Sequence, residues 1–125
     1  MREFVVQLAH RPGELARVTN ALSLYGVNIR SVAAMTVGEQ ALLRLIPDDV
    51  EAARSALGAS NISFAENETA VVLLENRAGE LTAVAAKLAE AGINLEAAYL
   101  VGLSDDLIEL AIVSDNVKKA KKVLE

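Results

Sequence analysis

The chain contains an internal repeat, and this repeat limits the folds open to it. The segment His10-Arg11-Pro12-Gly13-Glu14-Leu15 returns 66 residues later as Asn76-Arg77-Ala78-Gly79-Glu80-Leu81. The segment Gly26-Val27-Asn28-Ile29 returns at the same offset as Gly92-Ile93-Asn94-Leu95. Between Arg11 and Ile29, eight positions are identical to their partners 66 residues later. The 125 residues therefore form two similar units of about 60 residues each. Units this small bury little surface alone, so they are expected to pack on each other.

The pattern of the first unit predicts the order β-α-β-β-α-β. Branched residues favour strands, and apolar residues three and four apart favour helices. Pro12 suits a first helical turn, and Gly26 suits a left-handed helix end. The expected elements are a strand over 2–8, a helix ending at Gly26, strands over 28–37 and 41–46 around a Gly38-Glu39 turn, a helix capped by Asp48 or Asp49 and running to 57, and a short strand over 62–65.

The second unit repeats this order but stops before its last strand. Its expected elements are strands over 69–74, 94–101 and 107–113, a helix over 79–91, and a last helix capped by Ser114 or Asp115 and running to 124. The predicted fold is α+β, with two ferredoxin-like (βαββαβ) units whose antiparallel sheets carry helices on one face. The predicted domains are residues 1–66 and 69–125, with Glu66-Asn67-Glu68 as the only linker. The incomplete sheet edge of the second unit invites pairing.

Composition excludes several classes of function. The net charge of −5 argues against nucleic-acid binding, which needs clustered Lys and Arg. Four lysines at 118, 119, 121 and 122 are interpreted as the solvated face of the last helix, with a phosphate site as the alternative. The absence of cysteine excludes disulfides and thiolate chemistry. No signal segment or membrane span is apparent, so a cytoplasmic protein without a membrane partner is expected.

Catalysis has little support in the sequence. His10 is the only histidine, so no histidine pair could hold a metal, and neither a metal nor a cofactor is expected. Carboxylates such as Glu14 and Glu80 stand where first helical turns favour acidic residues, and are interpreted as caps and dipole partners. An enzyme whose active site forms between chains remains a weaker alternative.

The repeated loop is the candidate ligand site. It leads from a strand to a helix start, where free amides and the helix dipole attract an anion. Gly13 and Gly79 let a ligand approach the backbone. Asn28 and Asn94 are expected to begin the next strand close to that helix start, where each amide offers a donor and an acceptor. The combination suits a small zwitterion. The alternative is that each Asn merely closes its turn by bonding local backbone.

These motifs resemble those of ACT domains, and the resemblance covers essentially the whole chain as two tandem domains. The loop is similar to that of the regulatory domain of serine-regulated phosphoglycerate dehydrogenases. The resemblance implies a regulatory module that binds amino acids at the interface between paired domains. By position, Asn76 and Asn94 would hold the ligand in the second unit, and His10 and Asn28 in the first. Leu74 replaces a polar residue of those dehydrogenases, so serine is not implied.

The sequence and the resemblance together predict a non-catalytic module that binds a small amino acid or related metabolite. A homodimer is expected. The ligand-binding residues are predicted to be His10, Arg11, Pro12, Gly13, Asn28, Asn76, Arg77, Ala78, Gly79 and Asn94. The alternative function is a structural oligomerisation module that binds no ligand.

Overall fold

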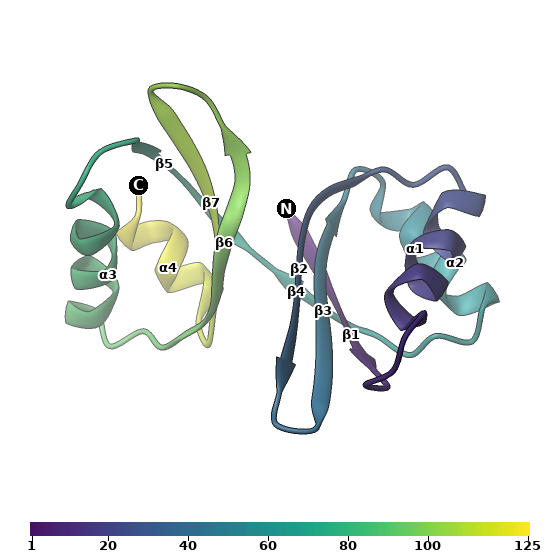
Figure 1. Ribbon diagram of the computed structural model, residues 1–125. Coiled ribbons are helices and arrows are strands. Elements are labelled where there is room, and N and C mark those ends of the chain that lie inside the picture. Colours follow the sequence, from purple (N-terminus) through teal and green to yellow (C-terminus); the bar gives the residue numbers. More distant parts are fainter. The chain divides into compact units, whose positions relative to one another are not determined.

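The computed structural model describes residues 1–125 and divides into two compact units. The first unit is Arg2–Asn67, and the second is Glu68–Glu125 together with Met1. Each unit has an antiparallel sheet with two helices on one face, as Figure 1 shows for each unit separately. The predicted α+β fold is confirmed.

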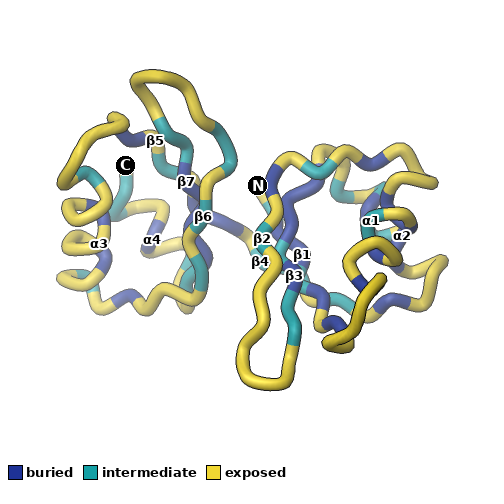
Figure 2. The backbone as a smooth tube through the Cα atoms, viewed as in Figure 1, coloured by how far each residue is buried: buried dark blue, intermediate teal, exposed yellow.

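The first unit has the predicted β-α-β-β-α-β order, and its strands pair in the order β2-β3-β1-β4. The core lies between the sheet and the helices, where Phe4, Leu22 and Leu57 are fully buried. Figure 2 shows this burial on the helix side and exposure at the tip of the β2–β3 hairpin. The elements are β1 (Arg2–Leu8), α1 (Glu14–Leu24), β2 (Ile29–Val37), β3 (Gln40–Pro47), α2 (Val50–Ala59) and β4 (Ala65–Glu68).

The second unit repeats this arrangement with three strands, in the order β5-β7-β6. Leu88, Ile112 and Ala120 are buried between its sheet and its helices. The prediction that this unit lacks a fourth strand is confirmed, and β5 therefore stands at an edge of the sheet. The elements are β5 (Ala70–Glu75), α3 (Glu80–Glu90), β6 (Leu95–Leu103), β7 (Leu107–Ser114) and α4 (Val117–Val123).

The fourth strand was predicted three residues too early, over 62–65. The residues expected to be a linker, 66–68, belong to β4 itself. Ile62 is apolar because it packs into the core ahead of the strand. Inside β4, Glu66 is held by Arg54, with an Nε–Oε2 distance of 2.7 Å, and by Arg2 at 3.2 Å. Ion pairs rather than apolar side chains hold this strand, so hydrophobicity did not reveal it.

Two helix starts also differ from the prediction. Helix α1 begins at Glu14 rather than at Pro12, because Gly13 has a φ of 90°, which no residue of a right-handed helix adopts. Helix α4 is capped by Asn116, whose side chain accepts from the Lys119 amide at 3.1 Å. Asp115 is not the cap, because its carboxylate accepts from the Asn94 amide instead. The expected Asp49 cap of α2 is confirmed.

A buried ion pair lies on the face of the first sheet that points away from the helices. Side chains alternate along a strand, so Glu3 faces opposite to the core residues Phe4 and Val6. Glu3 is completely buried and accepts from Arg44 at 2.6 Å and from the side chain of Asn67 at 2.9 Å. A buried carboxylate is tolerated only when such partners compensate its lost hydration.

Candidate functional site

The two repeated loops have the same backbone conformation. We call residues 10–13 the first loop and residues 76–79 the second loop. Gly13 and Gly79 both have φ of 90°, with ψ of −9° and −14°. In each loop, an arginine amide donates to the carbonyl two residues earlier, at 2.9 Å, from Arg11 in the first and Arg77 in the second. The sequence repeat is therefore a repeat of local geometry.

The helices that follow these loops begin without a side-chain cap. Gly13 and Gly79 occupy the cap positions and cannot supply one. By contrast, α2 and α4 are capped by the side chains of Asp49 and Asn116. The first amides of a helix have no partner within the helix. The repeated loops therefore lead to the two helix starts whose amides are not satisfied by a capping side chain, and the dipole adds partial positive charge there.

Charged side chains brace both loops. Glu14 is buried and accepts from the Ala9 amide at 3.3 Å, which ties the helix start back to β1. A hydrogen bond from Arg17 lowers the pKa of the Glu14 carboxyl, so Glu14 stays ionised. In the second loop, Arg77 contacts Glu80 at 2.6 Å and Glu75 at 2.8 Å. The hydrogen bond to Glu80 raises the pKa of Arg77.

The expectation that Asn28 and Asn94 lie close to the helix start of their own unit is wrong. In the second unit, the loop leaves the sheet where Glu75 pairs with Leu107. Asn94 precedes Leu95, which pairs with Ser114 at the other end of β7. Seven residue steps along β7 separate these ends, a distance of roughly 23 Å. Strands β5 and β6 are both antiparallel to β7 and therefore run in the same direction. The end of β5 and the start of β6 thus lie at opposite ends of the sheet.

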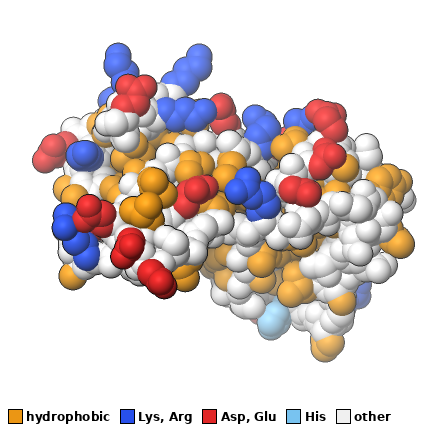
Figure 3. All heavy atoms as spheres, turned by 90° about the horizontal axis from the view of Figure 1, so that it is seen from above, with side chains coloured by type: hydrophobic (Ala, Val, Ile, Leu, Met, Phe, Trp, Pro, Cys, Tyr) orange, Lys and Arg blue, Asp and Glu red, His pale blue; other side chains and the backbone are white.

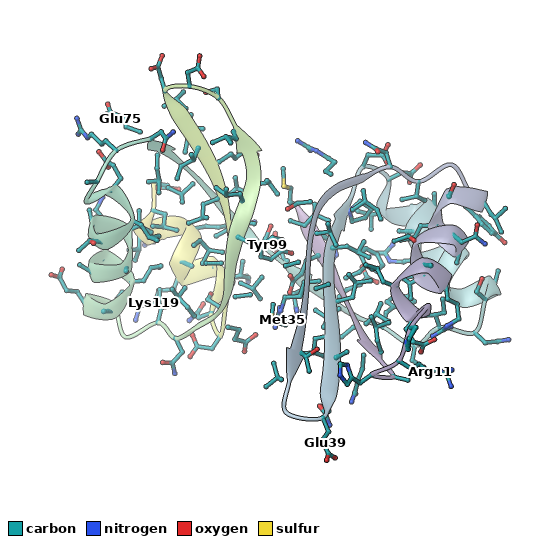
Figure 4. The ribbon with its side chains drawn as sticks, in the orientation of Figure 1. Arg11, Met35, Glu39, Glu75, Tyr99 and Lys119 are labelled. Carbon is teal, nitrogen blue, oxygen red and sulfur yellow. The ribbon has the colours of Figure 1, made fainter.

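The first unit has the same layout. Leu8, just before the first loop, pairs with Ala41, whereas Ile29, just after Asn28, pairs with Pro47. Figure 4 shows Arg11 of the first loop and Glu39 of the β2–β3 hairpin tip at one end of this sheet, and Figure 1 shows β2 starting at the other end. Neither unit brings its loop and its asparagine together.

The side-chain amides of Asn28 and Asn94 are exposed and make no hydrogen bond. Their turns are closed by aspartates instead. The Asn28 amide N–H donates to the Asp48 carboxylate at 3.0 Å, and the Asp48 N–H donates to the Asn28 carbonyl at 2.9 Å. Asp115 makes the same pair of contacts with Asn94, both at 3.2 Å. The turn-closing alternative for the asparagine side chains is therefore wrong.

A pocket of about 490 Å³ opens beside the second loop. The Asn76 amide donates to the Asp106 carbonyl at 2.8 Å, which joins the loop to the β6–β7 hairpin. The acidic residues of this hairpin were not among the predicted site residues, because a Ser-Asp-Asp turn looks like ordinary turn chemistry. Figure 4 marks Glu75 at this loop. The pocket is lined by Glu75, Asn76, Arg77, Asp105, Asp106 and Leu107.

The remaining predicted residues lie at the surface. His10, Arg11 and Pro12 are exposed, and His10, the single histidine of the chain, is seen in pale blue in Figure 3. Ala78 is exposed as well. Both loops thus lie at the surface, and Asn76 and Arg77 line a pocket together with the hairpin residues Asp105 and Asp106 rather than with Asn94.

Replacing Gly79 by alanine is expected to destabilise the protein by about 1–2 kcal/mol, the typical strain of a left-handed residue with a Cβ. An added Cβ at Gly79 meets no atom within 4 Å, so the cost comes from φ alone. Urea unfolding measures the change. Gly58→Ala is the matched control, since Gly58 lies in α2 with equal open space and no left-handed φ. We expect Gly58→Ala to stabilise slightly. Equal stability of Gly79→Ala and wild type would contradict the strain.

Comparisons with known proteins support the fold. No family model matches the sequence, and no curated protein matches it either. The structure of protein BT0572 from Bacteroides thetaiotaomicron is similar, with a TM-score of 0.88 and 22% identity over 98% of this chain and 85% of that chain. The regulatory subunits of aspartate kinase from Thermus thermophilus and Thermus flavus have TM-scores of 0.66 and 0.64, at 16% and 17% identity, each over 98% of this chain and 88% of theirs.

The fold is that of two ACT-like units in tandem, and the resemblance noted in the sequence is confirmed at this level. The matched aspartate kinase chains are described as regulatory subunits. None of the chain's helices has the length and apolar character required to cross a bilayer. No cluster of three or more His, Asp or Glu side chains could hold a metal ion.

Proposed function

We propose that this chain is a non-catalytic regulatory module that binds a small amino acid or a related metabolite. The observation that carries the proposal is that each unit has both an uncapped helix start and an exposed asparagine side chain without a hydrogen bond. A ligand carboxylate would accept from the free amides of the helix start. Its ammonium would bind the Asn oxygen and nearby carboxylates. The regulatory role is supported by the similarity in fold to the aspartate kinase regulatory subunits.

The second loop is the better candidate of the two. Asn76 offers an amide, and Asp105 and Asp106 add negative charge beside it for a ligand ammonium. Arg77 is already engaged by Glu75 and Glu80, so its charge does not cancel that of the two aspartates. The first loop has His10 and Ala9 at the positions of Asn76 and Glu75.

The asparagine of the site comes from another domain under this proposal. Asn76 and Asn94 lie at opposite ends of one sheet, so a single unit cannot place both on one small ligand. A second ACT-like domain that presents its own asparagine to the loop would complete the site. The homodimer expected from the sequence would supply such a domain, and it would make binding and assembly interdependent, with a coupling of typically about 1–3 kcal/mol.

Calorimetry and thermal melting with each of the twenty amino acids test the function. The protein is refolded from denaturant first, so that any ligand carried through purification is removed. At least one amino acid is expected to give saturable heat and, at 100 times its Kd, about 2.7 kcal/mol of added stability. If none produces heat or a melting shift, the amino-acid proposal fails, and the oligomerisation module without a ligand becomes the better explanation.

A further inference from the structure

The lysines of helix α4 carry an inference that does not depend on the ligand. Four of the five lysines in the chain lie on this helix. All four are exposed, whereas Ala120 between them is buried, and Figure 4 shows Lys119 on the side of the second unit that its helices cover. The rest of the chain carries a net charge of −9, since the whole chain carries −5 with these four positive charges. We call Lys118, Lys119, Lys121 and Lys122 the α4 lysines.

Ion pairing separates the α4 lysines from the arginines of the chain. Of the seven arginines, all except Arg30 contact a carboxylate within 4.0 Å. Of the α4 lysines, Lys121 contacts Glu68, but Lys118, Lys119 and Lys122 contact no carboxylate. The positive charges of these three side chains are therefore free to interact with another molecule.

The α4 lysines also repel one another. Residues three and four apart are neighbours on the surface of a helix. Lys118 therefore lies beside Lys121 and Lys122, and Lys119 lies beside Lys122. Such like-charge pairs destabilise a helix. The helix sequence, VKKAKKV, contains no acidic residue that would offset them.

The helix dipole opposes two of the four charges. Its positive end lies at the start of a helix, where acidic residues are favoured and cations are disfavoured. Helices α1, α2 and α3 each have a glutamate in the first turn, whereas α4 has Lys118 and Lys119 there and no acidic residue. The dipole favours only Lys121 and Lys122, in the last turn. The stability of the helix therefore does not account for Lys118 and Lys119.

We propose that the α4 lysines are a docking surface for a short acidic segment of a partner protein. Carboxylates of such a segment would neutralise the lysines and end their mutual repulsion. The helix has seven residues and is about 10 Å long, close to the Debye length at physiological salt. A nucleic acid or an anionic membrane extends well beyond that distance, so it would also be repelled by the net charge of −9 on the rest of the chain. A short acidic segment avoids this repulsion.

Fluorescence anisotropy of a labelled oligoglutamate peptide tests the surface on the full chain. We expect saturable binding at about 10 mM salt that is lost at about 1 M, because the Debye length falls from about 30 Å to about 3 Å. A Lys118→Gln, Lys119→Gln double variant should bind at least about tenfold more weakly. If wild type binds no peptide at low salt, the proposal is overturned.

A Lys87→Gln, Arg30→Gln double variant is the matched control. Both residues are exposed, lie outside α4 and contact no carboxylate, so this variant has the same net charge as the α4 variant. Its affinity for the peptide should stay within about twofold of wild type, because charges farther apart than a Debye length are largely screened. Equal weakening in the two double variants would show that net charge alone attracts the peptide, and would overturn the proposal.

Other polyanions distinguish the class of partner. Vesicles that contain phosphatidylserine and a single-stranded oligothymidylate should each bind wild type more weakly than the peptide does. Tighter binding of either one, lost in the Lys118→Gln, Lys119→Gln variant, would assign the surface to a membrane or to a nucleic acid instead of an acidic protein segment.

Thermal unfolding tests the repulsion itself. The Lys118→Gln, Lys119→Gln variant removes the like-charge neighbours, so its melting temperature should rise by about 2–5 °C. The Lys87→Gln, Arg30→Gln control should show no such rise. A melting temperature of the α4 variant below that of wild type would show that the two lysines serve the fold, and would overturn the proposal.

Discussion

Asn94→Ala is expected to lower the affinity for the amino acid that binds wild type by about 100-fold. The side-chain amide of Asn94 makes no hydrogen bond in the structure, so its proposed role is to bind the charged ligand, and such hydrogen bonds contribute about 1.5–3 kcal/mol. Isothermal titration calorimetry measures the loss. Stability should change by less than about 0.5 kcal/mol, as for other surface substitutions. Asn20→Ala, an exposed asparagine on α1, is the control for both measurements.

Mixing two variants shows whether the site is shared between molecules. Asn76→Ala and Asn94→Ala should each bind poorly alone. A mixed dimer contains one site in which both asparagines are intact, because one molecule supplies Asn76 and the other supplies Asn94. Refolding the two together should therefore restore about a quarter of the wild-type sites if dimers form at random. Full affinity of Asn94→Ala by itself would remove Asn94 from the site, and absence of restoration would argue against sharing between molecules.

Arg44→Met is expected to destabilise the protein by about 3 kcal/mol, because it leaves the carboxylate of Glu3 buried without the positive charge of Arg44 beside it. Urea unfolding followed by circular dichroism measures the change. Arg30→Met, at an exposed position of β2, is the control and should lie within about 0.5 kcal/mol of wild type.

A second variant shows whether the destabilisation comes from the buried charge of Glu3 or from the lost packing of Arg44. Glu3→Gln in the Arg44→Met background removes the buried charge, so it should recover part of the lost stability. An Arg44→Met protein as stable as wild type would show that Glu3 is adequately compensated without Arg44. A double variant less stable than Arg44→Met would show that the buried charge is not the cause.

The fold was accessible to sequence reasoning because its signals are local. The spacing of Leu15, Val18 and Leu22 sets a helix, and the glycine after it ends that helix. Because the same pattern returns 66 residues later, each such helix is indicated by two copies of its sequence signal. The exception was β4, where the strand is held by Arg54 and Arg2 through Glu66, and long-range ion pairs leave no periodic pattern.

Only part of the candidate site could be predicted from the sequence. The loop and the helix start after it could be predicted, because both depend only on the glycine and on residues close to it in the chain. The position of Asn94 relative to Asn76 depends on the directions of β5 and β6, and these are set by pairing with β7. Likewise, the pocket beside the second loop requires Asp105 and Asp106 to return next to Asn76, 29 and 30 residues earlier in the chain.

The sequence by itself determined the two ACT-like units and the order of their helices and strands, because the residues responsible are neighbours in the chain. The tertiary structure alone decided that each loop and its asparagine lie at opposite ends of a sheet. It also decided that Glu3 is buried against Arg44. These features depend on which strands pair and in which direction, and strand pairing joins residues whose separation in the chain carries no local signal.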